Sequence, residues 1–184
     1  MFMKNRKFAL TLAVFLAGVI GAGFANVAKA DPAEKLPSPA VLQGLLGGKL
    51  SAADLKDKVV VLQFFASWCV GCEKTMHDMV GLTGDHKNVI FVPVSVDEDV
   101  KSARTFFTNK SDLVKSLESK SYVDPTTDFA ARLNIKAVPS VIIIGNDGAV
   151  SARSTGHPSK ERLIELQAAM NGKATNASVQ GATH

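Results

Sequence analysis

Cysteine is scarce in this chain, which has only two among its 184 residues. Two cysteines exclude the multi-disulfide scaffold that many small exported proteins use. They are also too few for a structural zinc site unless histidines supply the missing ligands, and the four histidines are scattered. The sequence has no internal repeat, and its length fits one domain with short appendages.

Net charge is missing too, once the first 30 residues are set aside. Four of the 21 Lys and Arg residues lie in residues 1–30, which contain no acid, so 17 bases face 17 acids in the rest of the chain. The basic pI of about 9.1 therefore originates in the N-terminal segment. No nucleic-acid partner is expected.

The N-terminal segment has the three parts of a secretory signal peptide. A positive start is followed by 18 residues without charge, from Phe8 to Ala25, and then by Ala28-Lys29-Ala30. We expect residues 1–30 to be a signal peptide that is cleaved after Ala30. The alternative is an uncleaved signal-anchor, because the apolar run approaches the roughly 20 residues that span a bilayer. Either outcome predicts an extracytoplasmic, for example periplasmic, protein.

Composition divides the remaining chain into three parts. Residues 31–39 contain three prolines and mixed charge, which indicates a linker. Residues 40–171 carry the apolar runs of a folded domain. Residues 172–184 are small and polar, which predicts a disordered tail.

Within the folded part, apolar runs alternate with polar, helix-like segments. The sequence predicts buried strands over 59–65, 89–96 and 141–144, and a hairpin partner over 149–154. Helices are expected from the cysteines to about Gly81, from Asp97 to Phe107, from Asp124 through Leu133, and after Ser159, with part of residues 109–121 also helical. In the last helix we expect Leu163, Ile164, Leu166 and Met170 to face inward. This pattern is typical of an α/β fold with a central mixed β-sheet flanked by helices.

The two cysteines form a Cys-x-x-Cys pair, Cys69 and Cys72, directly after the first buried strand. A cysteine at a helix N-terminus has a pKa below the free value of about 8.5, because the helix dipole and unpaired N–H groups favour the thiolate. We expect Cys69 to be the exposed nucleophile and Cys72 to resolve the mixed disulfide. The closed loop is too short for a purely structural staple.

Trp68 before the pair, and Val138-Pro139 about 70 residues later, make the pattern more specific. With "LSAADLKDKVVVLQFFASWC", "VIFVPVSVDED" and "DPTTDFAARLNIKAVPSVIIIGNDGAV", the chain resembles the thioredoxin superfamily, and within it the TlpA/ResA-like extracytoplasmic thiol–disulfide oxidoreductases. The resemblance covers about residues 40–170 and implies a thioredoxin-like fold. It also implies a cis-proline at Pro139 and substrate contacts by Trp68, Val138 and Pro139. His157 would border the substrate groove.

Three positions near the cysteines depart from this family. Gln63 replaces the buried acid of thioredoxin, Thr75 replaces a glutamate common in the TlpA/ResA-like group, and His77 replaces a proline. Glu73 is close by, but we expect it to be solvated. Without a base, we expect Cys72 to keep a high pKa and release of the mixed disulfide to be slow near neutral pH. A pKa near or below 7 for Cys72 would contradict this.

The resemblance implies a reductant, acting in cytochrome c maturation or on copper-site cysteines, that needs no bound cofactor. It would exchange disulfides with proteins, receive electrons from a membrane partner and act as a monomer. Two alternatives stay open: a thiol oxidant, and a Cu(I) carrier using the cysteines with Met76, His77 and Met79. A peroxidase of the peroxiredoxin kind is disfavoured, because its Pro-x-x-x-Thr-x-x-Cys pattern is absent.

Overall fold

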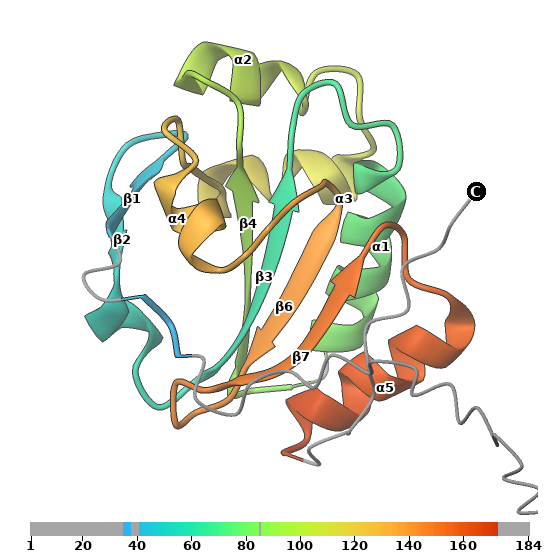
Figure 1. Cartoon of the computed structure of the whole chain (residues 1–184). Helices are drawn as coiled ribbons and strands as arrows, with labels where there is room; N and C mark the ends of the chain where they lie inside the picture. The colour runs from blue at the N-terminus through green and yellow to red at the C-terminus, as the bar shows by residue number, and fades with distance from the viewer. Residues whose placement is uncertain (1–34, 38–40, 85, 173–184) are drawn as a thin grey trace, which may run out of the picture.

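A seven-stranded mixed sheet forms the centre of the protein (Figure 1). The computed structural model describes residues 35–37, 41–84 and 86–172. The strand order is β2-β1-β5-β4-β3-β6-β7. Helices flank both faces of the sheet, so the expected α/β class is confirmed.

The three strands predicted from apolar runs are the inner strands of the sheet. β3 (Val59–Phe65) lies between β4 (Val89–Ser95), which runs parallel to it, and β6 (Ser140–Ile144), which runs antiparallel. β-branched and aromatic side chains suit such strands, because both faces are covered. β7 (Val150–Thr155) then pairs with β6 as the expected hairpin.

Three short strands on the other side of β4 were not predicted. They are β1 (Val41–Gly44), β2 (Lys49–Ser51) and β5 (Tyr122–Val123). β5 pairs parallel to β4 and antiparallel to β1, and β1 pairs antiparallel to β2. Strands of two to four residues are too short to show a period in the sequence, so their partners determine them.

Five α-helices and two single-turn 3₁₀ segments complete the described part of the chain. Their bounds are α1 Cys72–Thr83, α2 Val100–Thr105, α3 Asp112–Lys115, α4 Asp128–Arg132 and α5 Lys160–Met170, with η1 Ala52–Leu55 and η2 Glu118–Lys120. Ser159 caps α5 as expected, by accepting a hydrogen bond from the Arg162 N–H. α4 begins later than expected, at Asp128, because the buried Asp124 carboxylate accepts the N–H groups of Phe129 and Ala130.

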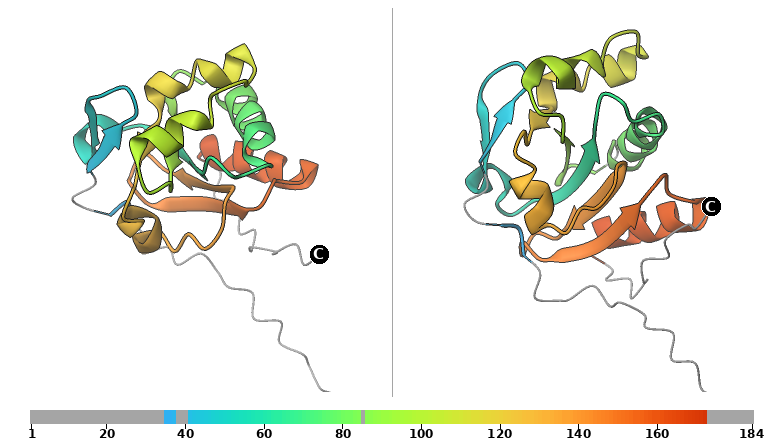
Figure 2. Two further views of the ribbon diagram at one scale, coloured as in Figure 1. Left: turned by 90° about the horizontal axis from the view of Figure 1, so that it is seen from above. Right: turned by 45° about the horizontal axis from the view of Figure 1, so that its top comes forward.

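Alternating side chains of β3 divide the core between the two faces of the sheet. Val60, Leu62 and Phe64 pack with α4, while the opposite face packs against α1 and α5 (Figure 2). Burying a large apolar side chain contributes about 1.5–3 kcal/mol. β3 therefore holds both layers together, and the loop that follows it starts from the most buried part of the fold.

Three phenylalanines fix α2 above the end of β3. The Phe65 ring centroid lies 4.8 Å from that of Phe106 and 5.6 Å from that of Phe107. Phe106 and Phe107 are in edge contact with each other at 5.3 Å. Such tilted aromatic pairs are favourable beyond their buried area. The cluster supports the C-terminal end of β3, where the loop that leads to the cysteines begins.

Two expectations need correction, one about the last helix and one about the linker. Ile164 does not face inward: it is 68% exposed, while Leu166 and Met170 are buried. The expected linker is partly docked, because Leu36 donates its N–H to the Gly148 carbonyl at 3.0 Å and Lys35 forms a β-bridge with Ala149.

The expected signal peptide (residues 1–30) and most of the expected tail lie outside the described residues. Among the helices that the structure does describe, none has the length and apolar character needed to span a bilayer.

Candidate functional site

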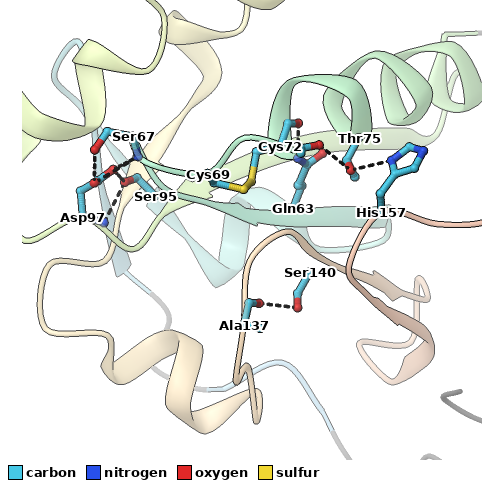
Figure 3. The surroundings of a disulfide bond; sticks show 11 residues. Gln63, Ser67, Cys69, Cys72, Thr75, Ser95, Asp97, Ala137, Ser140 and His157 are labelled. Atoms are coloured by element: carbon cyan, nitrogen blue, oxygen red, sulfur yellow. Dashed lines mark hydrogen bonds between the residues drawn. A yellow bond between two sulfur atoms is a disulfide. The ribbon is translucent and has the colours of Figure 1, made fainter. Parts of the chain in front are cut away.

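The two cysteines lie where β3 ends and α1 begins, and they form a disulfide (Figure 3). Cys72 is the first residue of α1, with Gly71 at its N-cap. Cys69 lies in the turn before the helix, not within its first turn, and its N–H donates to the Ala66 carbonyl. Cys69 is 7% exposed and Cys72 is fully buried. An incoming sulfur therefore reaches Cys69 before Cys72.

Exposed apolar side chains flank the disulfide on the solvent side. Trp68 is 69% exposed and Val70 is 98% exposed, although both are large and apolar. Isolated exposure of this kind is normal, but two such residues around a reactive pair indicate a contact surface. Trp68 directly precedes Cys69 and Val70 directly follows it, so both exposed side chains lie next to this cysteine.

Val138 and Pro139 face the disulfide from the loop before β6. The Val138–Pro139 peptide bond is cis. A Cβ added to Gly71 would lie 3.9 Å from the Pro139 Cδ atom, so the proline ring packs directly over the Cys-x-x-Cys loop. Val138 is half-buried against the cluster that contains both cysteines. The structure thus brings Trp68, Cys69, Cys72, Val138 and Pro139 together.

A buried carboxylate, which the sequence did not single out, holds the loop before Cys69. Asp97 is almost fully buried after β4, and it accepts hydrogen bonds from the Ser67 N–H at 2.9 Å and the Ser67 hydroxyl at 2.7 Å. The Ser95 hydroxyl donates to the same carboxylate at 2.6 Å. Hydrogen bonds to a charged acceptor are the strong ones. Asp97 therefore fixes the start of the loop that carries Trp68 and Cys69.

Gln63 lies under the resolving cysteine. Its side chain is fully buried in β3, and its Nε2 donates to the Cys72 carbonyl at 3.0 Å. Its Oε1 has no hydrogen-bond partner among the described residues. The amide fixes the first turn of α1, but it cannot accept a proton as a carboxylate would.

Thr75, one turn after Cys72, is fully buried and makes two hydrogen bonds. Its Oγ1 lies 3.1 Å from the Gly71 carbonyl oxygen, and also 3.1 Å from Nδ1 of His157. His157 comes from the loop between β7 and α5, and the structure places its imidazole against α1. The sequence could not show this contact, because Thr75 and His157 are separated by 82 positions.

His77 points elsewhere. Its Nε2 lies 2.9 Å from the Ser111 hydroxyl, at the N-cap of α3. Met76 packs in the cluster of the cysteines, whereas Met79 packs in the cluster of α5. The donors of the Cu(I) alternative are therefore not gathered around the sulfurs. Within the described residues, no group of three or more His, Cys, Asp or Glu side chains is placed to hold a metal ion.

Glu73 is paired and not simply solvated. Its carboxylate lies 3.1 Å from Nζ of Lys110, which also lies 5.0 Å from the centroid of the Phe106 ring. The hydrogen bond from Lys110 is the main reason that the pKa of Glu73 is lowered from its ordinary value. A more acidic carboxyl is a weaker base, so Glu73 is poorly suited to take a proton from Cys72.

We expect Lys110→Met to raise the pKa of Glu73 toward its ordinary value, because the main favourable partner of the carboxylate is removed. Since the pKa is lowered in the folded state, the pair stabilises the protein above the unfolded pKa and is lost as the pH falls through the folded one. An NMR pH titration of the Glu73 side chain measures the change. Lys115→Met, which removes a lysine facing Asp112, is the control. An unchanged Glu73 titration in Lys110→Met would contradict the assignment.

One pocket of about 570 Å³ lies far from the cysteines. It is lined by residues that include Val59, Val89 and Gly145. These residues lie at the start of β3 and β4 and after the end of β6, at the opposite end of the sheet from Cys69. This pocket is therefore separate from the Cys69–Cys72 pair.

Comparison with known proteins agrees with this geometry. The family model described as "AhpC/TSA family" matches residues 32–153. The chain is 29% identical over 170 residues to a thiol-disulfide oxidoreductase ResA of Bacillus cereus, covering 87% of this chain and 94% of the relative. It is 26% identical over 159 residues to the thiol:disulfide interchange protein HelX of Rhodobacter capsulatus, covering 81% and 86%.

Among solved structures, the fold is similar to that of a protein from Chlorobium tepidum, described as a possible thiol:disulfide interchange protein DsbE. The TM-score is 0.63 at 24% identity, and the match covers 74% of this chain and 94% of that one. The expected thioredoxin-like fold is thus confirmed. The chain belongs to the AhpC/TSA family, and it is a thioredoxin-like thiol–disulfide oxidoreductase that is similar to the ResA proteins.

Proposed function

We propose that this protein is an exported thiol–disulfide oxidoreductase that reduces disulfides in protein substrates outside the cytoplasm. The observation that carries the proposal is the arrangement of Cys69 and Cys72. Cys69, between the exposed Trp68 and Val70, keeps 7% exposure, whereas Cys72 is fully buried. This is the arrangement that a nucleophile and a resolving thiol require.

The reaction proceeds in two exchange steps. The Cys69 thiolate attacks a substrate disulfide, so a mixed disulfide forms and one substrate thiolate leaves. The Cys72 thiolate then attacks Sγ of Cys69, which breaks the mixed disulfide, releases the second substrate thiolate and forms the Cys69–Cys72 bond. Two electrons pass from the pair to the substrate, and each released thiolate takes a proton.

Protein substrates are supported by the open surface around the pair. Trp68 and Val70 offer apolar contacts, and the loop of Val138 and Pro139 lies beside the sulfurs as a place for an extended chain to pair. The substrates whose disulfides it reduces would include apocytochrome c or copper-site cysteines. A membrane partner would return the electrons. The protein would act as a monomer and need no bound cofactor.

Export is supported by the positive start, the uncharged run and Ala28-Lys29-Ala30 of the N-terminal segment. The resulting location is periplasmic or otherwise extracytoplasmic. The protein would be membrane-anchored if the segment is not cleaved.

The direction of electron flow is tested by the reduction potential of the Cys69–Cys72 pair. We expect equilibration with glutathione to give a reduction potential of about −270 mV, as for a reductant. The fraction of oxidised protein is read from the mass difference after thiol alkylation. A value near about −120 mV would instead make the protein an oxidant.

The Cu(I) carrier alternative predicts a different result. A carrier holds one Cu(I) per reduced pair under anaerobic conditions and does not turn over a disulfide substrate. We expect turnover of a protein disulfide such as insulin, with no stoichiometric Cu(I) retained after passage through a chelating column. Stoichiometric retention without turnover would contradict the proposed reaction.

A further inference from the structure

The proton of Cys72 has no direct route to water during the second exchange step. The side chain of Cys72 is fully buried, and the nearest surface opening is at Cys69. In the mixed disulfide, Cys69 is bonded to the substrate, which covers that opening. A thiol must lose its proton before it can attack, so the proton needs another exit.

The buried hydroxyl of Thr75 is in hydrogen-bond contact with the imidazole of His157, which reaches solvent (Figure 3). Thr75 lies three residues after Cys72 on α1, and side chains at this spacing share one face of a helix. The Thr75 hydroxyl is buried, whereas the His157 side chain is 32% exposed. The imidazole is thus the part of this contact that meets water.

Charged neighbours surround the other imidazole nitrogen. Nε2 of His157 contacts Nζ of Lys74 and lies 3.5 Å from Oδ2 of Asp78. Lys74 and Asp78 also pair with each other at 3.5 Å.

The remaining charged and titratable side chains on the first turns of α1 are engaged elsewhere. Glu73 pairs with Lys110, and His77 bonds Ser111. Gln63, from β3, faces Cys72 but does not titrate. Among the side chains that the structure places around Cys72 and Thr75, His157 is therefore the titratable group in hydrogen-bond contact with Thr75.

We propose that His157 is a positioning residue for the resolving step, and that it takes up the Cys72 proton through the Thr75 hydroxyl. This rests on the thiol–disulfide exchange proposed above. For this step the imidazole carries its hydrogen on Nε2, which faces Oδ2 of Asp78, and Lys74 pairs with Asp78, so that Nδ1 can accept a proton. The hydroxyl turns from the Gly71 carbonyl toward Nδ1, gives its own proton to the imidazole and receives the proton of Cys72. The Cys72 thiolate then attacks Sγ of Cys69. The imidazolium later releases its proton to water or to the departing substrate thiolate.

This relay changes the expectation that the mixed disulfide is released slowly. Cys72 can keep a high pKa, and the relay still lowers the barrier to its deprotonation when the imidazole is neutral. The resolving step should therefore depend on His157 and Thr75, whereas the attack by Cys69 should not.

The test separates the two exchange steps with one probe. Reduced protein is mixed with 5,5′-dithiobis(2-nitrobenzoate) in a stopped-flow instrument, where attack by Cys69 releases one coloured thiolate and resolution by Cys72 releases the second. We expect His157→Gln and Thr75→Val to slow the second phase on the order of 100-fold at about pH 7 and to change its pH profile. The first phase should be unchanged within about twofold in both variants.

Two matched variants complete the experiment. Thr75→Ser keeps the hydroxyl and should restore the second phase. His77→Gln removes a histidine that lies on α1 itself and contacts Ser111, and it should leave both phases as in the unchanged protein. The proposal is overturned if His157→Gln resolves at the original rate with the original pH profile, if both phases slow together, or if His77→Gln has the same effect. If no coloured thiolate is released by the unchanged protein, the proposed exchange itself fails.

Discussion

Cys72→Ser will accumulate a stable mixed disulfide with a protein substrate, and steady-state turnover will fall to the uncatalysed level. The reason is that Cys69 remains able to attack, whereas the buried thiol that should break the adduct is gone. The adduct is measured by non-reducing electrophoresis and intact mass after mixing the reduced variant with oxidised insulin. Its mass should exceed that of the variant by one substrate molecule.

Cys69→Ser is the matched variant, and it should form no adduct. Cys72 alone has no exposed surface through which a protein disulfide could reach it. The pair of variants thus separates attack from resolution. Adducts of equal yield in both variants would contradict the assignment of Cys69 as nucleophile.

Asp97→Ala will lower the free energy of unfolding by about 3 kcal/mol, because it leaves one buried and two half-buried donors without their charged acceptor. The donors are the N–H and hydroxyl of Ser67 and the hydroxyl of Ser95. The loop that carries Cys69 then loses its attachment to the end of β4. We therefore expect slower attack by Cys69 as well as lower stability. Chemical denaturation followed by tryptophan fluorescence measures the loss of stability, since Trp68 is the only tryptophan.

Asp99→Ala provides the control two residues further on. Asp99 caps α2 by accepting the Ser102 N–H, and its side chain is exposed. Its loss should cost less stability than the loss of Asp97, and the rate of attack by Cys69 should not change. Equal losses in the two variants would mean that the buried carboxylate has no special role in the loop.

The inner sheet was accessible from the sequence, but its outer strands were not. The sequences of β3, β4 and β6 are continuous apolar runs, because each strand is covered on both faces of the sheet. β5 has only two residues, and it exists because β4 and β1 lie on either side of it. Ile164 was predicted to be buried, and the structure leaves it exposed. A helical pattern alone cannot say how wide the covered face of a helix will be.

The same division applies to the site. Cys69 and Cys72 are neighbours in the sequence, and Val138-Pro139 could be placed opposite them by resemblance. The contact of His157 with Thr75, and that of Asp97 with Ser67, join distant parts of the chain. No local pattern predicts such pairs, because they depend on how the loops pack after the sheet has formed.

The docked residues at the start of the described chain determine how the domain would present itself if it were attached to a surface. Leu36 bonds the turn between β6 and β7, at the opposite end of β6 from Pro139. The five residues of β6 separate these points by about 16 Å. A tether attached before Lys35 would therefore hold the domain at the end opposite the Cys69–Cys72 pair. The two sulfurs would lie on the side that faces away from the attachment.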